Sequence, residues 1–551
     1  MTTPTPTSEG VAALSSEAPD GLPDAATLAR WANEFFSTVG ATAPVASAPP
    51  LKVPSFSAAP SLPDIGTLDS AVQAGLSALT RSSAQDFVHP ELPSVPMFSS
   101  GVPSGIPQSP PTWSTSSADR VPSFYFLETA IPPNAAARTA AHPAFNVEAI
   151  RKDFPILQER VHGRPLVWFD NAATTQKPLA VIERLSQFYR HENSNIHRAA
   201  HELAARSTDA YEGARRQAQR FLGAASVGEI VFVRGATEAI NLVAQAWGRK
   251  NIGPGDEILI SHLEHHANIV PWQMLAAERG AVVKVVPVDS KGQLRLDEYQ
   301  RLLNSRTKLV SITHVSNALG TVTPVKDIVD LGHRAGACVL IDGAQSVSHI
   351  PIDVQSIDAD FFVLSGHKVF GPTGIGVLYG KAKVLEGMPP WQGGGNMIED
   401  VTFEGTRYQA PPSRFEAGTG NIADAVGLGA ALEYLTTIGM PNIEHYESQL
   451  LQYATERVSK VPGLEIIGTA THKASVLSFV IAGVEPTAIG SALNQEGIAV
   501  RAGHHCAQPI VRRFGLEATV RASFAFYNTC AEIDAMTAVL QGVAASAGRR
   551  A

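Results

Sequence analysis

Two stretches decide the fold, CVLIDGAQ at residues 338–345 and FFVLSGHK at residues 361–368. Each is an apolar run of strand length, rich in β-branched or aromatic side chains, that ends on polar residues. Because the runs are apolar throughout, we expect both to be strands buried in an α/β sheet. Asp342 and Lys368 then emerge at strand ends, which is where such folds place ligand sites.

The segments around these two stretches extend the pattern. Further strands are expected at 229–233, 257–261 and 308–312, and a helix at 237–247. Strands that alternate with helices predict a parallel or mixed sheet with crossover helices. After about Ala425 the pattern changes to helix and then to mixed strand and helix. We therefore predict an α/β fold with a large domain at 144–424, whose N-terminal segment also contributes to a smaller α+β domain at 425–551.

The first 143 residues differ in kind from the rest. They hold 21 of the 38 prolines and one lysine, Lys52. Segments rich in Pro, Ala and Ser bury too little apolar surface to offset the entropy of ordering them, so we predict a disordered arm at 1–143. Three apolar islands interrupt the arm, at 22–36, 62–79 and 124–127, and the first two open with Leu-Pro-Asp. They are either chance hydrophobic residues in a linker or docking motifs, and the repeat favours docking motifs.

Composition narrows the class of partner. A net charge of -8 over 551 residues argues against nucleic acid, because phosphate binding needs clustered Lys and Arg. No apolar run reaches the ~18 residues of a membrane span. A secretory signal begins with a basic region, and this chain has no basic residue before Arg30. Cys338, Cys506 and Cys530 are too few for a disulfide framework. We expect a cytoplasmic protein with no nucleic acid or membrane partner.

The strand ends at 342 and 368 suit one cofactor. A carboxylate at a buried strand end stays ionised only beside a cation or a strong donor. For Asp342 the pyridinium nitrogen of pyridoxal 5'-phosphate (PLP) is such a partner, and capping of a helix that begins in DGAQ is the alternative. Lys368, 26 residues further on beside a Gly-rich turn, favours PLP, because a lysine whose pKa is lowered forms a Schiff base. Ser365 and His367 add donors for a phosphate or for the ring oxygen.

Two further segments fit PLP. RGATE at 234–238 lies between a strand and a helix, so its backbone N–H groups and the Thr237 hydroxyl face an anion site, although a tight turn without a ligand is the alternative. In EHHAN at 264–268, the His265 imidazole can stack on a cofactor ring and move protons. The His-His pair also suits a metal, but Glu264 alone lies at ligand spacing, so no metal is expected.

A reactive thiol is predicted in RAGHHCAQP at 501–509. Neighbouring His and Arg lower the pKa of a thiol, and the thiolate is the nucleophile. The glycine and the proline favour a mobile loop around Cys506. Buried packing is the usual role of a free cysteine, and Cys338 at the start of an apolar strand fits it.

From about Phe145 onward the chain resembles the class V aminotransferase superfamily, and more closely the type II (SufS-like) cysteine desulfurases. The motifs that carry the resemblance are DNAATT (170–175), NIHR (195–198), EHHAN (264–268), HVSN (314–317), DGAQ (342–345), SGHK (365–368), RFEAGT (414–419) and the loop that contains Cys506. The resemblance implies the PLP-dependent transferase fold type I. It departs at Ala236 and Gly420, where the family often has Thr and Pro.

The resemblance also implies a role for each site residue. Lys368 would hold PLP as a Schiff base, His265 would stack on its ring as the acid/base, and Cys506 would be the sulfur nucleophile. The implied cofactor contacts are Asp342 to the pyridinium, Gln345 to the ring oxygen, Thr237, Ser365 and His367 to the phosphate, and Thr419 to the phosphate of the other subunit of a homodimer. The implied ligands of the substrate carboxylate are Asn317, Arg501 and Arg521, since guanidinium groups fork two donors onto two oxygens.

The implied reaction converts L-cysteine to L-alanine and leaves a persulfide on Cys506. A sulfur-acceptor protein or a reductant then takes the sulfur, as in iron-sulfur cluster assembly or sulfur storage. Three alternatives stay open: a selenocysteine lyase acting on L-selenocysteine, a desulfurase for iron-sulfur assembly that is not encapsulated, and a scaffold of minor activity whose arm recruits partners.

The arm at 1–143 is the large departure from ordinary desulfurases. It resembles the long disordered arms of desulfurases that are packaged as cargo in encapsulin shells. That resemblance implies a loading function for the arm and a location inside an encapsulin nanocompartment.

Overall fold

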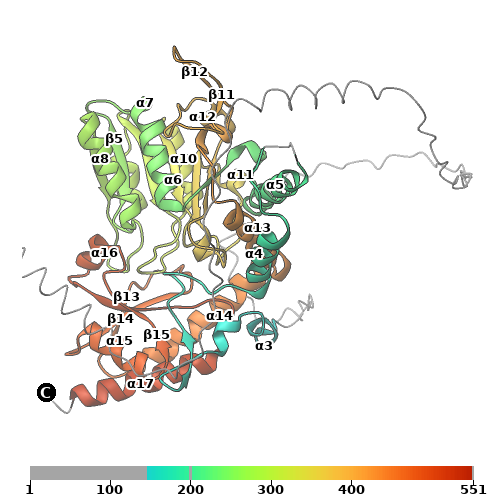
Figure 1. Ribbon diagram of the computed structural model, residues 1–551. Helices are drawn as coiled ribbons and strands as arrows, with labels where there is room; N and C mark the ends of the chain where they lie inside the picture. The colour runs from blue at the N-terminus through green and yellow to red at the C-terminus, as the bar shows by residue number, and fades with distance from the viewer. Residues whose placement is uncertain (1–144, 198–200, 549–551) are drawn as a thin grey trace, which may run out of the picture. The chain divides into compact units, whose positions relative to one another are not determined.

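The computed structural model describes residues 145–197 and 201–548 (Figure 1), which lie in one compact unit, Ile131–Ala551. The predicted disorder and docking motifs of the arm at 1–143 fall outside the described residues. Among the helices that are described, none is both long and apolar enough to cross a membrane.

A seven-stranded mixed sheet forms the centre of the larger lobe. Its strands, in spatial order, are β4 (Ile230–Val233), β10 (Gly376–Gly380), β9 (Phe361–Ser365), β8 (Cys338–Asp342), β7 (Thr307–Thr313), β5 (Glu257–Ser261) and β6 (Val282–Val286). β10 runs antiparallel to both β4 and β9, and the other pairs are parallel. The α/β fold and the five quoted strands are confirmed. The sequence analysis did not anticipate β10, whose run between Gly376 and Gly380 is short, or β6, which is largely exposed or half-buried.

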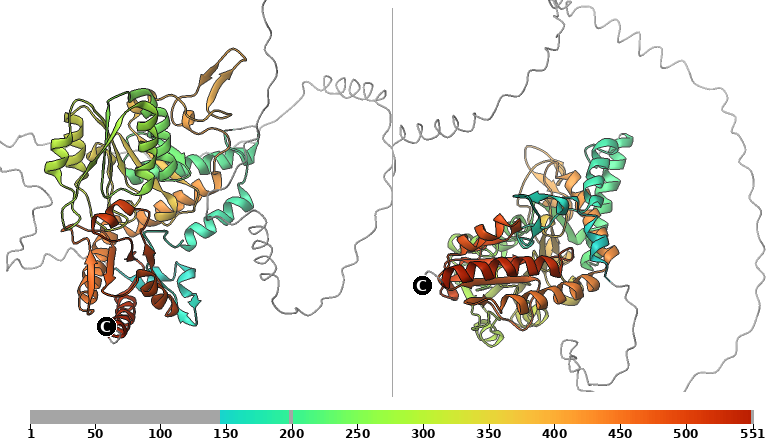
Figure 2. Two further views of the ribbon diagram at one scale, coloured as in Figure 1. Left: turned by 90° about the vertical axis from the view of Figure 1, so that its left-hand side faces the viewer. Right: turned by 90° about the horizontal axis from the view of Figure 1, so that it is seen from below.

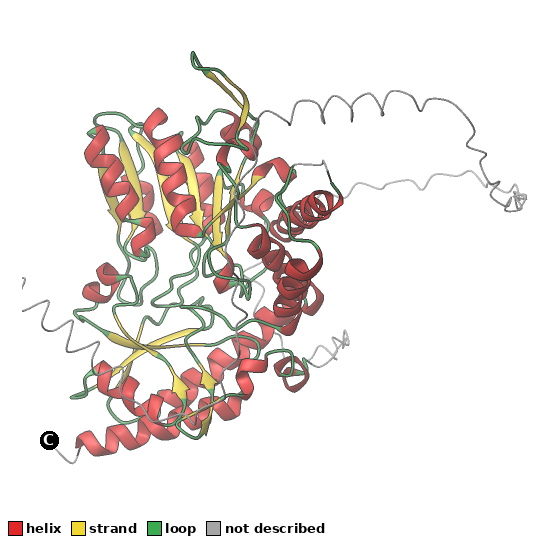
Figure 3. Cartoon of the chain, viewed as in Figure 1, coloured by secondary structure: helices red, strands yellow, loops and turns green. Residues whose placement is uncertain are grey.

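Helices cover both faces of this sheet, which makes three layers (Figure 3). One face carries α4 (Leu179–His191), α5 (Glu202–Leu222), α10 (Val325–Arg334), α11 (Val354–Ile357) and α13 (Ile422–Ile438). The other carries α6 (Ala236–Leu242), its π-helical continuation η4 (Val243–Gly248), α7 (Arg249–Asn251), α8 (Val270–Arg279) and α12 (Ala382–Glu386).

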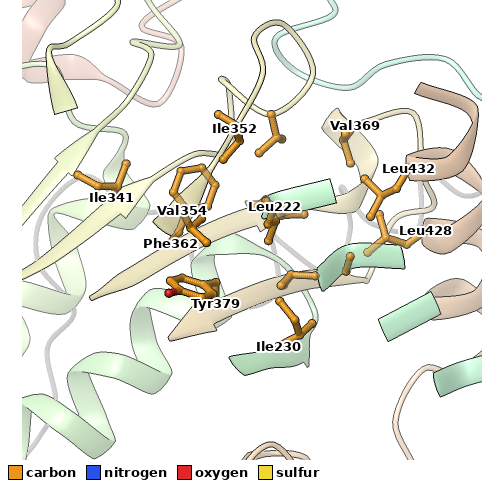
Figure 4. Packing of buried hydrophobic residues seen from close by; sticks show 14 of the residues in the cluster. Leu222, Ile230, Ile341, Ile352, Val354, Phe362, Val369, Tyr379, Leu428 and Leu432 are labelled. Atoms are coloured by element: carbon orange, nitrogen blue, oxygen red, sulfur yellow. The ribbon is translucent and has the colours of Figure 1, made fainter. Parts of the chain in front are cut away.

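Neighbouring residues of one strand point into different cores. Phe361 belongs to the core with α6 and α8, whereas Phe362 belongs to the core with α5 and α13. Phe362 lies near Tyr379 and Ile230 in the second of these cores (Figure 4). This alternation is the consequence of side chains on a strand pointing to opposite faces, and it explains why the runs are apolar throughout.

A four-stranded antiparallel sheet centres the smaller lobe. Its order is β13 (Leu464–Ile467), β14 (Val476–Ile481), β17 (Thr519–Ser523) and β16 (Arg501–Gly503). The helices α14 (Met440–Val458), α15 (Pro486–Gln495) and α17 (Cys530–Gly548) pack against it (Figure 2). The early strand β3 (Val167–Trp168) pairs with β15 (Ile498–Ala499), and Phe169 lies in this core. The domain boundary near residue 425 stays a prediction.

Short elements complete the described chain. They are α3 (Val147–Arg151), η2 (Pro155–Gln158), β1 (Arg160–Val161), β2 (Arg164–Pro165), η3 (Val227–Glu229), η5 (His266–Asn268), α9 (Leu296–Leu302), η6 (Gly366–Lys368), β11 (Ile398–Val401), β12 (Thr406–Tyr408), η7 (Ser413–Phe415) and α16 (Gln508–Arg513).

The close approach of β10 to the turn after β4 predicts the effect of one substitution. A Cβ at Gly376 would stand 2.6 Å from Gly235 Cα and closer still to the Leu364 carbonyl oxygen. We expect Gly376→Ala to lower the free energy of unfolding by about 1–3 kcal/mol, because backbone atoms of neighbouring strands cannot move away from the added Cβ without strain. The control is Gly542→Ala on α17, where a Cβ meets open space and should raise stability by about 0.5–1 kcal/mol. Equal denaturation midpoints for the two variants would contradict this packing.

Candidate active site

A pocket of about 190 Å³ opens beyond the carboxyl ends of β8 and β9. Eleven of the twelve predicted site residues line it: Thr237, His265, Asn317, Asp342, Gln345, Ser365, His367, Lys368, Arg501, Cys506 and Arg521. The twelfth, Thr419, is exposed and does not line this pocket. Its contact with the phosphate of a second subunit stays a prediction.

Asp342 and Lys368 bring opposite charges to the pocket. Asp342 ends β8, and the backbone N–H of Ala344 donates to its Oδ1 at 2.9 Å. Burial raises the pKa of Asp342, while that hydrogen bond and Lys368 lower it. Lys368 follows β9 in the turn η6. Burial lowers its pKa to about 8, and the attraction of Asp342 partly opposes the shift. A pyridinium nitrogen requires a buried carboxylate such as Asp342. A Schiff base requires an amine of lowered pKa such as Lys368.

The turn after β4 offers an anion cradle. The backbone N–H of Ala236 donates to Ser365 Oγ at 2.9 Å, and the continuous helix α6–η4–α7 starts at this residue. Gly235 allows the close approach, because a Cβ there would stand 3.2 Å from Ser365 Oγ. Ala236, Thr237, Ser365 and His367 all line the pocket, and they supply the kinds of donor that a phosphate group needs. The donor set therefore fits PLP.

His265 is a neutral ring with a fixed proton. Burial, and then the charge of Lys368, lowers the pKa of His265 to about 3. The backbone N–H of Ala267 donates to His265 Nδ1 at 3.0 Å, so the neutral ring carries its own proton on Nε2. A neutral imidazole is suited to stacking on a cofactor ring, and it brings no positive charge to the pocket.

The predicted carboxylate ligands keep free hydrogen-bonding groups. Arg521 is buried, donating from Nη2 to Asp170 Oδ1 at 2.8 Å and from Nη1 to the Asn317 carbonyl at 2.9 Å. Among the described residues, Arg521 Nε and Asn317 Oδ1 are buried without a partner. Buried polar groups without partners are rare, and at a pocket they indicate groups that await a ligand. The Arg521 Nε–H can donate to a carboxylate, whereas Asn317 Oδ1 only accepts, and Asn317 Nδ2 already donates to the His505 carbonyl at 2.6 Å. The contacts of Asn317 therefore do not support its predicted role as a carboxylate ligand. Sequence reasoning missed Asp170, although it opens the DNAATT motif.

Cys506 lies in the loop between β16 and α16. Arg501 Nη2 is 3.9 Å from Cys506 Sγ. Although the sequence favours a mobile loop, hydrogen bonds hold this one: His266 N donates to the Cys506 carbonyl at 2.8 Å and Ala507 N to the His504 carbonyl at 2.9 Å. Of the other cysteines, Cys338 has a thiol pKa raised by burial, which makes it unreactive.

Glu264 is another residue whose place in the site the sequence did not reveal, because the sequence suggested it only as a metal ligand. Its carboxyl group is fully buried and accepts hydrogen bonds from Ser261 Oγ, Asn268 Nδ2 and Thr313 N. Burial, with a smaller contribution from the charge of Asp342, raises the pKa of Glu264 to about 8 against the effect of these donors. Across the described residues, no group of three His, Cys, Asp or Glu side chains is placed to hold a metal.

The fold and the pocket define a PLP-dependent enzyme of fold type I. The family described as aminotransferase class-V matches residues 167–536. The chain belongs to the class-V aminotransferase family, and its cofactor is PLP.

Relatives of this chain within the family are cysteine desulfurases. One from Synechococcus elongatus is 67% identical over 75% of this chain, and the alignment spans 66% of that relative's own length. A probable cysteine desulfurase of Mycolicibacterium paratuberculosis is 58% identical over 92% of this chain and 75% of its own length. The solved structure of the cysteine desulfurase CsdA from Escherichia coli is 40% identical, with a TM-score of 0.68, over 73% of this chain and 99% of that one.

The buried Glu264 predicts a specific pH dependence of stability. The folded protein keeps the Glu264 proton up to about pH 8, whereas the unfolded chain releases it near the ordinary value of 4.5. Unfolding therefore releases a proton between these pH values, and stability falls as pH rises. We expect Glu264→Gln, which stays neutral, to reduce this fall by about 1 kcal/mol per pH unit. Urea unfolding at several pH values would measure it, and parallel stability curves for the two proteins would contradict it.

Proposed function

We propose that the chain is a type II cysteine desulfurase, which converts L-cysteine to L-alanine and carries the sulfur as a persulfide on Cys506. The observation that carries this proposal is that Lys368 and Cys506, from different lobes, line one pocket. The names of the relatives support it, as does the short loop around Cys506, held by hydrogen bonds.

Binding of cysteine is assigned to the polar groups that lack partners. Arg521 and Arg501 would hold the substrate carboxylate, and Asn317 Oδ1 would accept a hydrogen bond from the substrate. Asp170 and the Asn317 carbonyl orient the Arg521 guanidinium from two sides. The carboxylate then fixes the substrate so that its sulfur faces Cys506.

When bound, PLP supplies an electron sink that stabilises negative charge at the substrate α-carbon. Asp342 would keep the pyridinium nitrogen protonated, and Gln345, whose Nε2 donates to the Ala172 carbonyl at 2.7 Å, would contribute to holding the ring. Lys368, with its pKa lowered to about 8, is suited to remove the α-proton and return one to the product near neutral pH. His265, which lines the same pocket, would stack on the ring.

Cys506 completes the reaction. Its thiolate attacks the substrate sulfur, so that an S–S bond forms as the bond between sulfur and the β-carbon breaks. Protonation of the carbon skeleton gives alanine, and the outer sulfur stays on Cys506. A sulfur-acceptor protein, as in iron-sulfur cluster assembly, or a reductant then removes it. We infer a homodimer in which Thr419 reaches the phosphate of the other subunit.

The arm at 1–143 is proposed as a loading segment for an encapsulin shell. An alignment over 92% of the chain includes most of the residues before Phe145, so the relative from M. paratuberculosis has a comparable arm. A shared arm with repeated Leu-Pro-Asp openings supports a binding role. The enzyme would then act in the cytoplasm inside a protein shell that stores sulfur.

The roles of Cys506 and Lys368 separate in a turnover assay. Wild-type protein should release alanine and sulfide from cysteine in the presence of a reductant. We expect Cys506→Ser to lose roughly 10²-fold or more of this activity while keeping the absorbance of bound PLP, and Lys368→Ala to lose both. Alanine formation by Cys506→Ser at the wild-type rate would contradict the proposal. If activity of Cys506→Ser survives with selenocysteine alone, the enzyme is a selenocysteine lyase.

Removal of the arm tests its role independently. A chain without residues 1–140 should keep the desulfurase rate, because every predicted active-site residue lies after Phe145. It should lose co-purification with a co-expressed encapsulin shell. Shell association equal to that of the full chain would contradict a loading function for the arm.

A further inference from the structure

The nucleophile lies in an unusual stretch of backbone. His505 and Cys506 have φ angles of +56° and +55°, which places two successive non-glycine residues in the left-handed region. Clashes between Cβ and the backbone make this region unfavourable for L-residues, and single residues rather than pairs usually occupy it. The turn therefore persists because its surroundings hold it.

Hydrogen bonds to the backbone of the turn supply part of that hold. Asn317 Nδ2 donates to the His505 carbonyl at 2.6 Å, and His266 N donates to the Cys506 carbonyl at 2.8 Å. Both donors come from the larger lobe, whereas the turn follows β16 of the smaller sheet. These bonds fix the carbonyl groups on the side of the larger lobe. On the side of the smaller sheet, β16 pairs with β17 up to Gly503, and one side-chain contact continues this connection into the turn.

That contact is the His505 side chain. It is buried, and Nε2 lies 2.8 Å from Thr519 Oγ1 at the start of β17. Among the described residues, His505 Nδ1 has no partner. The bond to Thr519 therefore ties the residue before the nucleophile to the strand that carries Arg521, two residues further on.

His505 is not placed to transfer protons. Burial, followed by the charges of Arg521 and Arg501, lowers the pKa of His505 to about 2. The ring stays neutral at every pH at which the enzyme would work. Its contribution is the geometry of a hydrogen bond rather than a charge or a proton.

We propose that His505 is a positioning residue, whose hydrogen bond to Thr519 sets the distance between the Cys506 thiol and the substrate held by Arg521. This inference rests on the proposed desulfurase function. Because β17 holds the substrate carboxylate and the turn that holds the thiol follows β16, which pairs with β17, this side-chain bond acts beside the strand pairing in setting whether the thiol reaches the substrate sulfur.

Paired variants test the bond from both ends. Thr519→Val removes the hydroxyl with little change of shape, and Thr519→Ser keeps it as the matched control. His505→Gln places an amide near the position of Nε2, whereas His505→Asn reaches only the position of Nδ1. We expect Thr519→Val and His505→Asn to lose about tenfold in kcat for alanine formation, with KM changed by less than about twofold. Thr519→Ser and His505→Gln should stay within about threefold of wild type.

Two further measurements exclude a general structural effect. The absorbance of bound PLP and its rapid change on mixing with cysteine should be unaltered in all four variants, because His505 acts after substrate is bound. Iodoacetamide should alkylate the half-buried Cys506 at least threefold faster in Thr519→Val and His505→Asn, since a released turn relaxes toward solvent.

The outcomes separate the two proposals. Wild-type kcat and alkylation rates in Thr519→Val and His505→Asn would overturn the role of His505, and so would a loss of bound PLP that accompanies the loss of kcat. Failure of the wild-type protein to release alanine would overturn the desulfurase function, and the alkylation rates would still decide whether the bond holds the turn.

Discussion

The structure depends on how buried charge is neutralised at one edge of the large sheet. Asp342 and Arg521 are buried and Lys368 is half-buried around one pocket, and an unpaired buried ion is costly. Asp342 and Lys368 favour each other's charged forms across the ends of β8 and β9, while Asp170 pairs with Arg521. The order of the strands is what makes this balance possible, because it brings charges that are distant in the sequence to one place.

The balance also requires both lobes. Arg521 and Cys506 come from the smaller sheet and the loop that precedes α16, whereas the residues that fit PLP come from the larger lobe. The segment after β3 links them: Asp170 forms a β-bridge with Ser523 and pairs through its side chain with Arg521. Segments from three parts of the chain therefore build one site, and a change in the packing of the lobes would alter the distance between Lys368 and Cys506.

The sequence predicts the parts of this arrangement that are local. Apolar runs predict β5, β8 and β9 because these strands are buried on both faces. The polar or charged residues at the ends of these runs are easily recognised in the sequence. The positions that sequence reasoning missed act through distant partners. Thr519 reads as an ordinary strand residue, and its importance comes from His505, 14 residues earlier. Glu264 reads as a metal ligand beside two histidines, and burial among Ser261, Asn268 and Thr313 gives it a different character.

Three histidines near the nucleophile show that residue type alone does not assign a role. His265 and His504 accept backbone N–H groups through Nδ1, from Ala267 and Cys506, whereas His505 bonds Thr519 through Nε2. Burial lowers the pKa of His265 to about 3 and that of His505 to about 2, so neither is charged near neutral pH. The pKa of Lys368, about 8, lies close to neutrality, and a general acid or base works best when its pKa is near the working pH. Lys368 is therefore our proposal for the group that transfers the proton, and the acid/base role of His265 stays a prediction.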